Sequence, residues 1–466
     1  MAIRGRSGRV AGSVLLSLTA LVWAWGGSAL GVPSLTTLVS VASDGTQGNE
    51  VSWSPAISGN GRFVAFTSNA TNLVPGDTNA RDDVFVHDLQ TGETTRVSVS
   101  SDGTQSIEGG GLPAISGSGR FVGFVAADTN LVPGDTNSAV DVFVHDRETG
   151  ETTRVSVASD GTQGTASFAH AQSGEPTISA DGRFVAFEST FSNLVPGDTA
   201  TCASLPNIPP GECPDVFVHD RQTGETILVS VASDGTQAND QSFAPAISAD
   251  GRSVAFVSAA SNLVPGDTNA FLDVFVHDLQ TGETTRVSLA SDGTEGNEVS
   301  LAPSISADGR TVAFVSDANN LVPRDTNGRR ELFLGEDVFV HDRDTGETSL
   351  VSMAFNRRPS NDASFEPSIS TDGRFVAFSS FATNLVRRDT NKIQDVFVRD
   401  RETGTTVRAS VASDGTQAIG IAGPFDFSAD PSISDDGHVV AFFSSATNLV
   451  PDANGTSDVF VRELAA

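Results

Sequence analysis

Apolar and polar positions repeat along this chain in the alternation that is typical of short β-strands. The fourth copy of the repeat reads PAISADGRSVAFVSAASNLVPGDTNAFLDVFVHDLQTGETTRVSLASDGTE, and a similar pattern returns about every sixty residues. Each copy has four strand-like segments: P-x-I-S, the apolar run after a turn arginine, D-V-F-V-H-D and T-T-R-V-S-V. The turns between them contain D-G or T-G, which suit tight turns. We therefore expect an all-β repeat protein.

The repeat occurs seven times. The arginine that follows the turn glycine falls at Arg62, Arg120, Arg183, Arg252, Arg310 and Arg374, with His438 in the seventh copy. The phenylalanine of the third segment falls at Phe85, Phe143, Phe217, Phe275, Phe339, Phe397 and Phe460. Four antiparallel strands repeated radially form the blade of a β-propeller. The pattern predicts a seven-bladed β-propeller of four-stranded antiparallel blades.

The two ends of the repeat region complement each other. The last copy stops after its third strand, Asp458-Val459-Phe460-Val461-Arg462. The missing fourth strand is matched by Leu35-Thr36-Thr37-Leu38-Val39-Ser40-Val41, which precedes the first copy. An N-terminal strand that completes the last blade would close the ring and remove both exposed sheet edges. We expect this closure.

The first 31 residues have the composition of a signal peptide. Arg4, Arg6 and Arg9 precede an apolar stretch from Val10 to Leu30, and small residues follow at Ala29-Leu30-Gly31. A retained membrane anchor is the alternative, because the apolar stretch is nearly long enough to span a bilayer. We expect residues 1–31 to be a signal peptide, residues 32–466 to form a single propeller domain, and the product to be secreted or periplasmic, without a membrane span after cleavage.

The two cysteines, Cys202 and Cys213, lie in one insertion that contains Pro and Gly. An oxidising compartment would favour a disulfide between them. Two free thiols or half of a metal site are the alternatives, although neither a histidine nor a third cysteine lies nearby in the sequence.

Charge narrows the set of partners. The chain has 58 acidic and 28 basic residues, for a formal net charge of −30. Such a surface repels phosphate backbones and anionic lipids, so nucleic acid and membrane surfaces are not expected as partners.

The units P-x-I-S-x-D-G-R-x-V-A-F-x-S and D-V-F-V-x-D-x-x-T-G resemble the WD40-like (PD40) repeats of TolB-type propellers. The resemblance extends from Leu35 to Leu464. It implies the fold, whereas related propellers serve as binding platforms, as accessory domains of peptidases and as parts of lyases. The chain has seven units rather than the six of TolB and lacks its separate N-terminal domain, so a TolB-like role in envelope assembly is not expected.

The common catalytic motifs are absent from the sequence. It contains no G-x-S-x-G elbow, H-E-x-x-H or phosphate loop. Five histidines occupy one repeated position beside the aspartate of the third strand and are interpreted as structural: His87, His145, His219, His277 and His341. His438 replaces a turn arginine, which leaves His170 as the one singular histidine. We expect no catalytic residue.

A D-x-N-x-x-x-D loop recurs in five copies. Its members are Asp77, Asn79 and Asp83; Asp135, Asn137 and Asp141; Asp267, Asn269 and Asp273; Asp389, Asn391 and Asp395; and Asp452, Asn454 and Asp458. Oxygen ligands at this spacing could surround Ca²⁺. Asp and Asn also form turns by bonding their own backbone, and three side chains are fewer than Ca²⁺ requires. Calcium is therefore one interpretation and turn formation the other; no further cofactor is expected.

The large differences in length between copies fall in the loops that join the second and third strands and in the linkers between blades. An unusual group of basic residues lies in the same loops and linkers. Seven arginines of the fifth and sixth copies either replace repeat residues or, at Arg329 and Arg330, lie in an extended loop: Arg324, Arg329, Arg330, Arg357, Arg358, Arg387 and Arg388. Guanidinium groups bind carboxylate, sulfate and phosphate through two parallel hydrogen bonds. The hypothesis is a site for an anionic ligand, and the alternative is that these arginines are solvated.

Loops that vary on a rigid scaffold commonly bind ligands. The sequence is therefore interpreted as an exported, monomeric, non-enzymatic binding module for an extracellular protein or acidic glycan. The alternative is a propeller-type polysaccharide lyase or hydrolase that uses carboxylates at the mouth of the central channel. The P-x-I-S strands, which are nearly identical and contain no unrepeated acid, favour the binding module.

Overall fold

The computed structural model describes residues 34–165, 173–199, 202, 213–323, 325, 336–420 and 427–465. Pro33–Ala466 is one compact unit. All regular elements of the described residues are β-strands. None of these residues forms a helix that is long and apolar enough to cross a membrane. The signal peptide prediction, residues 1–31, lies outside the described residues.

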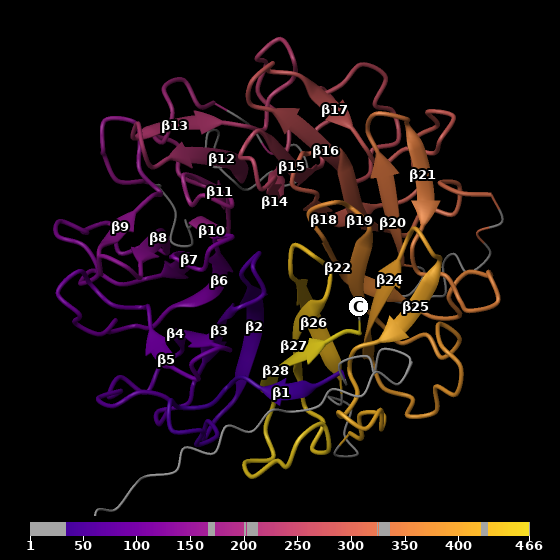
Figure 1. Cartoon of the computed structure of the whole chain (residues 1–466). Coiled ribbons are helices and arrows are strands. Elements are labelled where there is room, and N and C mark those ends of the chain that lie inside the picture. The colour runs from indigo at the N-terminus through magenta and orange to yellow at the C-terminus, as the bar shows by residue number, and fades with distance from the viewer. Residues whose placement is uncertain are drawn as a thin grey trace, which may run out of the picture. The chain divides into compact units, whose positions relative to one another are not determined.

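Seven four-stranded antiparallel sheets form the blades of the ring (Figure 1). The innermost strands are β2 (Ser52–Ile57), β6 (Gly111–Ile115), β10 (Ser173–Ile178), β14 (Ser242–Ile247), β18 (Ser300–Ile305), β22 (Ser364–Ile369) and β26 (Ser428–Ile433). The second strands are β3 (Phe63–Ser68), β7 (Phe121–Ala126), β11 (Phe184–Ser189), β15 (Ser253–Ser258), β19 (Thr311–Ser316), β23 (Phe375–Ser380) and β27 (Val439–Ser444).

The outer half of each blade consists of two further strands. The third strands are β4 (Asp83–Asp88), β8 (Asp141–Asp146), β12 (Asp215–Asp220), β16 (Asp273–Asp278), β20 (Asp337–Asp342), β24 (Asp395–Asp400) and β28 (Asp458–Glu463). The outermost strands are β5 (Thr94–Arg96), β9 (Thr152–Arg154), β13 (Glu225–Leu228), β17 (Thr284–Arg286), β21 (Glu347–Leu350), β25 (Thr405–Arg408) and β1 (Thr36–Leu38). The prediction of a seven-bladed all-β propeller is confirmed.

The N-terminal strand closes the ring. β1 pairs antiparallel with β28, with Thr36 opposite Arg462 and Leu38 opposite Phe460. Blade seven is therefore built from β26, β27, β28 and β1, as the complementary ends of the sequence predict. Pairing the first strand with the last joins the two ends of the chain in one sheet and covers the outer edge of β28.

The core follows from the alternation within the second and third strands. In blade one, the rings of Phe66 and Phe85 stack with centroids 5.8 Å apart. A pair of phenylalanines from the second and third strands is in contact in all seven blades, and Val and Ala from neighbouring blades pack around each pair. Burying such apolar surface is the main driving force for this packing.

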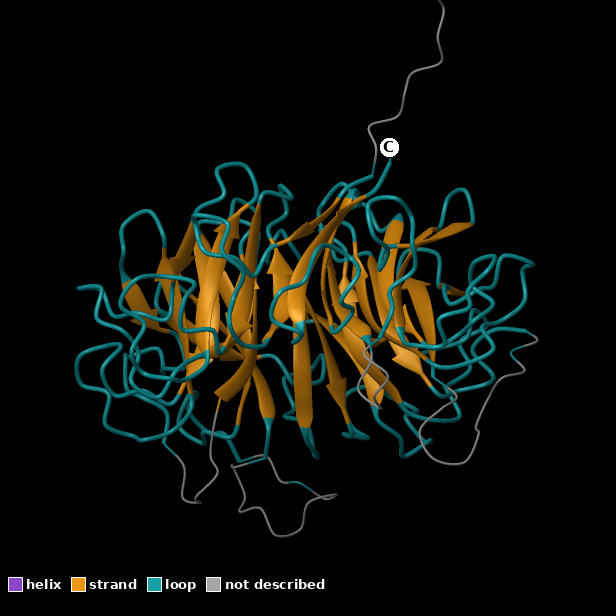
Figure 2. Ribbon diagram, turned by 90° about the horizontal axis from the view of Figure 1, so that it is seen from below, coloured by secondary structure: helices purple, strands orange, loops and turns teal. Residues whose placement is uncertain are grey.

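The strands run between two faces of the ring (Figure 2). One face, the turn face, holds the D-G turns after the innermost strands and the T-G turns after the third strands. The opposite face, the loop face, holds the loops between second and third strands and the linkers between blades. The loop face is where long connections can vary without disturbing the sheets.

Buried polar pairs hold the outer strands in register. The Nδ1 atom of His87 lies 2.8 Å from Oγ1 of Thr94 on the neighbouring strand, and the other four repeated histidines make the same contact. Burial lowers the pKa of these histidines, to about 4 for His219. Their partner is therefore a threonine across the sheet, and they form part of the blade rather than of a site.

Candidate functional site

The residue before the proline of the innermost strand is the position at which the blades differ most in chemistry. It reads Ser54, Leu112, Glu175, Ala244, Ala302, Glu366 and Asp430. All seven residues have positive φ, between 42° and 53°, and the pairing of innermost and second strands shifts register there. Each position is thus a β-bulge, which redirects a side chain and recurs beside active sites.

Three of these bulge residues are acids, which corrects the expectation that the innermost strands contain no unrepeated acid. The expectation considered only P-x-I-S, whereas the strand begins three residues before the proline. The acid in each case immediately precedes that proline. Comparing the residue before the proline in all seven copies would have found the difference.

Glu366 and Asp430 are joined directly. The backbone N–H of Asp430 donates to Oε2 of Glu366 at 2.8 Å. The hydroxyl of Ser379, on β23, donates to the same Oε2 at 2.5 Å. Ser54 of blade one bonds the side chain of Asp430, so the bulges of blades six, seven and one form one hydrogen-bonded chain.

The electrostatics of this chain favour a protonated carboxyl. Burial, with the charge of Glu366 adding to it, raises the pKa of Asp430 to about 7. The carboxyl of Glu336, just before β20, also has a raised pKa. Burial and the negative charges of Asp317 and Glu366 raise it to about 7. We call Glu366, Asp430, Glu336, Ser379 and Ser54 the axial carboxylate cluster.

A second acidic pair lies in blade three. Glu175 is the bulge residue of β10, and Glu188 lies on β11 opposite Gly174. Oε2 of Glu188 accepts a 3.1 Å hydrogen bond from the backbone N–H of Ala244, the bulge residue of the next blade. Burial raises the pKa of both carboxyls, and the charge of Glu175 raises that of Glu188 further.

A carboxyl whose pKa lies near neutrality can donate a proton and can also accept one. In the axial carboxylate cluster such a group, Asp430, lies beside Glu366, whose oxygen is held in place by two donors. Pairs of carboxyls in unlike environments are the groups that glycoside hydrolases use for acid–base chemistry. The cluster is therefore suited to proton transfer.

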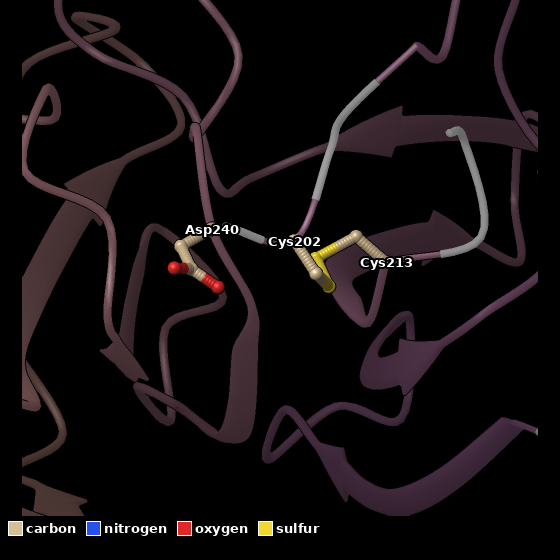
Figure 3. Close-up of side chains that lie close together, drawn as sticks. All are labelled: Cys202, Cys213 and Asp240. Carbon is tan, nitrogen blue, oxygen red and sulfur yellow. A yellow bond between two sulfur atoms is a disulfide. The ribbon is translucent and has the colours of Figure 1, made fainter. Parts of the chain in front are cut away.

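Among the described residues, one group of three His, Cys, Asp or Glu side chains lies close enough together to hold a metal ion, but its chemistry does not fit one. Cys202, Cys213 and Asp240 lie close together (Figure 3). The two sulfur atoms are joined in a disulfide, with the Cα atoms 5.3 Å apart. The sulfur atoms of a disulfide are not thiolate ligands, so this group lacks the donors that a metal ion would need.

Arginines occupy the D-x-N-x-x-x-D loops of four blades. In blade one, Nη1 of Arg96 lies 3.5 Å from both Asp77 and Asp83, and Asn79 donates to Asp83. Arg154, Arg286 and Arg408 bridge the equivalent aspartates. In these four loops a Ca²⁺ ion would compete with a guanidinium for the same oxygens.

In blade seven the residue equivalent to Arg96 is Leu38, opposite Phe460. There the amide of Gln47 bridges Asp452 and Asp458, at 3.0 and 2.7 Å. Burial raises the pKa of Asp458 to about 6. Calcium binding stays a prediction for these five loops, and the loop of blade seven is the one where no arginine opposes it.

The four described arginines of the predicted anion site, Arg357, Arg358, Arg387 and Arg388, lie on two loops of the loop face. These loops touch, because the guanidinium of Arg387 stacks 5.2 Å from the ring centroid of Phe355, itself 51% exposed. We call this group the rim arginines. Arg324, Arg329 and Arg330, together with His170, lie outside the described residues.

Two of the rim arginines occupy backbone positions that favour glycine. Arg357 has φ 62°, and glycines with φ near 84° hold the equivalent place in other linkers, as at Gly45. Arg388 has φ 61°, where blade one has Gly76. Left-handed backbone costs a residue with a Cβ about 1–2 kcal/mol.

Neither a family model nor a curated protein matches this chain. Solved structures do match. One is an oligogalacturonate lyase in complex with manganese, 14% identical, covering 93% of this chain and 97% of its own, with a TM-score of 0.53. Another is the oligogalacturonate lyase of Vibrio parahaemolyticus, 13% identical, with the same coverage and TM-score. TolB from Acinetobacter baumannii, 14% identical, matches 75% of this chain and 64% of its own, with a TM-score of 0.40.

The expectation of a non-enzymatic binding module is contradicted. Two of the solved structures that match nearly the whole chain are oligogalacturonate lyases, which are enzymes. In addition, the innermost strands do contain unrepeated acids, namely Glu175, Glu366 and Asp430. Likeness at this identity establishes the fold alone. The chain is a seven-bladed β-propeller, a fold that it shares with oligogalacturonate lyases.

Proposed function

We propose that this protein is a glycan-cleaving enzyme whose reaction centre is the axial carboxylate cluster. The observation that supports the proposal most is the pairing of Asp430, whose carboxyl has a pKa of about 7, with Glu366, whose Oε2 accepts hydrogen bonds from the N–H of Asp430 and the hydroxyl of Ser379. Such a pair supplies the proton donor and the proton acceptor that cleavage of a glycosidic bond requires.

Each residue has a distinct role in the proposed reaction. Asp430 donates a proton to the glycosidic oxygen as the C–O bond breaks. Glu366 takes a proton from the water that attacks the anomeric carbon, so a C–OH bond replaces the glycosidic bond and the two protons balance. Ser379 and the backbone N–H of Asp430 hold the Glu366 oxygen in position.

Elimination is the competing chemistry, and the matched lyases make it worth testing. In elimination a base removes the C5 proton of a uronate and the bond from C4 to the leaving oxygen breaks. Elimination also needs positive charge beside the uronate carboxylate. The axial carboxylate cluster consists of carboxyls and hydroxyls, which favours hydrolysis.

Aromatic side chains near the cluster support a sugar as substrate. Phe365 adjoins Glu366 on β22, and its ring makes an edge contact with Phe381 at a centroid distance of 6.1 Å. Phe381 is 40% exposed at the loop-face end of β23. Exposed aromatic rings offer flat apolar surface, the kind that packs against the C–H face of a sugar.

The rim arginines offer a separate contact for an acidic glycan. We propose that they bind substrate carboxylates or sulfates away from the reaction centre, because guanidinium pairs with such groups bidentately. Retention of the protein on heparin and polygalacturonate resins, compared with a variant in which Arg357, Arg358, Arg387 and Arg388 are all serine, tests this role. Unchanged retention would remove it.

Export is part of the proposal. An apolar N-terminal segment after three arginines, together with a disulfide, fits a monomeric enzyme that acts outside the cytoplasm. We also propose that the seven sequence units are related to the PD40 repeats of TolB-type propellers. Mass spectrometry of the mature protein tests export, because cleavage after Gly31 gives a defined mass and retention of residues 1–31 gives another.

The assay of function separates the two chemistries in one experiment. Purified protein is incubated with polygalacturonate, alginate, xylan and a neutral β-glucan. New reducing ends without absorbance at 235 nm indicate hydrolysis, and both together indicate elimination, because elimination leaves a conjugated double bond. Absence of both signals on all acidic and neutral glycans would overturn the proposal.

A further inference from the structure

The first residue of the second strand forms a repeated aromatic contact on the turn face. In blade one this residue is Phe63. The guanidinium carbon of Arg62, from the same blade, lies 4.7 Å from the ring centroid, and that of Arg147, from the next blade, lies 4.5 Å from it. In blade two, Phe121 has the same two kinds of neighbour at 4.8 and 4.4 Å. Each ring thus receives two cation–π contacts.

A glycine of the next blade makes room for each ring. A Cβ atom on Gly119 would lie 2.1 Å from Cδ2 of Phe63, and one on Gly182 would lie 2.0 Å from Cδ2 of Phe121. Side chains at those glycines would collide with the ring. The arginine pair and the glycine therefore form a slot that is shaped for an aromatic ring.

Blade four retains the slot without its ring. Ser253 stands where blades one and two have phenylalanine, while Arg252, Arg343 and Gly309 remain at the equivalent positions. Ser253 lies opposite Asp278, just as Phe63 lies opposite Asp88. A cavity of about 560 Å³ opens here between blades four and five, and it is lined by arginines and acidic side chains together with Ser253 and Gly309.

The guanidinium from the next blade is already in place. Nη1 of Arg343 donates to the carbonyl of Gly309 at 2.7 Å, the contact that Arg147 makes with Gly119 beside the filled slot of blade one. Arg343 is therefore held as it would be if a ring were present.

The arginine of the same blade is less engaged. Arg62 makes two hydrogen bonds to Asp88, at 2.8 and 2.7 Å. In blade four, the carboxylate of Asp278 accepts from the backbone N–H groups of Gln280 and Thr281, and Arg252 reaches it through charge alone. Among the described residues, then, the Arg252 guanidinium keeps its hydrogen-bonding capacity for a ligand.

We propose that this cavity binds small planar aromatic carboxylates, with the ring in the place of the missing phenylalanine between Arg252 and Arg343. The ring receives the cation–π contacts that Phe63 receives in blade one. The carboxylate takes the hydrogen bonds that Arg252 has available. The site lies on the turn face, so it goes beyond the proposed glycan cleavage at the axial carboxylate cluster and is independent of it.

Two probes of equal charge separate the ring from the carboxylate. Benzoate has a planar aromatic ring, and cyclohexanecarboxylate has a puckered saturated ring of similar size. Calorimetry and ligand-observed NMR with the wild-type protein should show benzoate binding about tenfold more tightly, because the saturated ring gains no cation–π contact. Equal affinity for the two probes, or no binding of benzoate, would overturn the proposal.

Filling the slot is the matched test in the protein. Ser253→Phe places a ring where Gly309 already leaves room, so this variant should keep its fold, unfold at a higher temperature and lose benzoate binding by at least about tenfold. Ser253→Ala leaves the slot open and should bind benzoate as the wild type does. Undiminished binding by Ser253→Phe, with its fold verified by circular dichroism, would place the ligand elsewhere and contradict the assignment.

Discussion

The backbone N–H of Asp430 donates a 2.8 Å hydrogen bond to the side chain of Glu366, and so joins the bulges of two neighbouring blades through a carboxylate. Both residues have left-handed backbone, with φ of 52° at Glu366 and 53° at Asp430. Left-handed backbone at residues with a Cβ costs free energy, and such strain concentrates at functional sites. The same bulge in every blade means that the scaffold is repeated while the side chain at that position is free to change.

The pH dependence of stability should report the raised pKa of Asp430. The folded-state pKa is about 7 against an ordinary value of 3.8, so between these pH values the folded state binds more protons than the unfolded state. Stability should therefore fall as pH rises from about 4 to 7 through this group. Asp430→Asn should remove that contribution, and thermal unfolding at pH 5 and pH 8 measures it. A wild type and variant that change in parallel between the two pH values would contradict the assignment.

The five buried histidines should act in the opposite direction. Their pKa values are lowered by burial, to about 4 for His219, so the unfolded state binds more protons below the ordinary value of 6.5. The stability that these neutral histidines contribute should be complete above pH 6.5. It should be lost as pH falls toward 4, at up to about 1.4 kcal/mol per pH unit for each histidine. Denaturant unfolding of His219→Gln between pH 7 and 4.5 should show a shallower loss than the wild type. An unchanged slope would mean that the ring is charged in the folded protein.

Glycine at two rim positions should stabilise the fold while weakening anion binding. Arg357→Gly and Arg388→Gly relieve left-handed backbone at φ 62° and 61°. The relief of about 1–2 kcal/mol is offset by about 0.5–1 kcal/mol of added backbone entropy in the unfolded chain. The net gain for each should be about 0.5 kcal/mol, measured by denaturant unfolding, with earlier elution from heparin. Arg358→Gly, which has no positive φ to relieve, is the control and should gain no stability.

Closure of the ring should depend on β1. Removal of residues up to Leu38 leaves the edge of β28 unpaired, and an unpaired edge invites association with another chain. The truncated protein should unfold at a lower temperature and elute as larger species in size-exclusion chromatography with light scattering. A chain that begins at Leu35 retains β1 and is the control. Monomeric, equally stable truncated protein would show that the pairing of Thr36–Leu38 with β28 contributes little.

Much of the fold could be predicted because its signals are local and repeated. The alternation of apolar and polar residues in Asp83–Asp88 predicts a strand, and the turn glycines predict the hairpins. The complementary ends of the chain predict that the first strand closes the ring. Pairings between distant residues were not visible in this way. Arg96 and Asp83 lie on different strands of blade one. It is the pairing of these strands that places the Arg96 guanidinium between Asp77 and Asp83.

The axial carboxylate cluster was missed for a different reason. A repeat is recognised by the residues that its copies share, whereas Glu175, Glu366 and Asp430 stand at a position where the copies differ. The direction of a bulge side chain also depends on positive φ, which residues such as Leu112, Glu175 and Glu366 do not signal in advance. Finding Glu366 next to Asp430 requires knowing that blades six and seven are neighbours and that both bulge.

The most direct test of the account is the rate of glycan cleavage by Asp430→Asn and Glu366→Gln, measured beside the wild type and Glu93→Gln. Glu93 is an exposed turn-face carboxylate, so its variant makes the same chemical change away from the axial carboxylate cluster. Removing a general acid or base should lower the rate by about 10²–10⁴-fold in the first two proteins and leave Glu93→Gln unchanged. Full activity in both Asp430→Asn and Glu366→Gln, with their folds intact, would contradict the central claim.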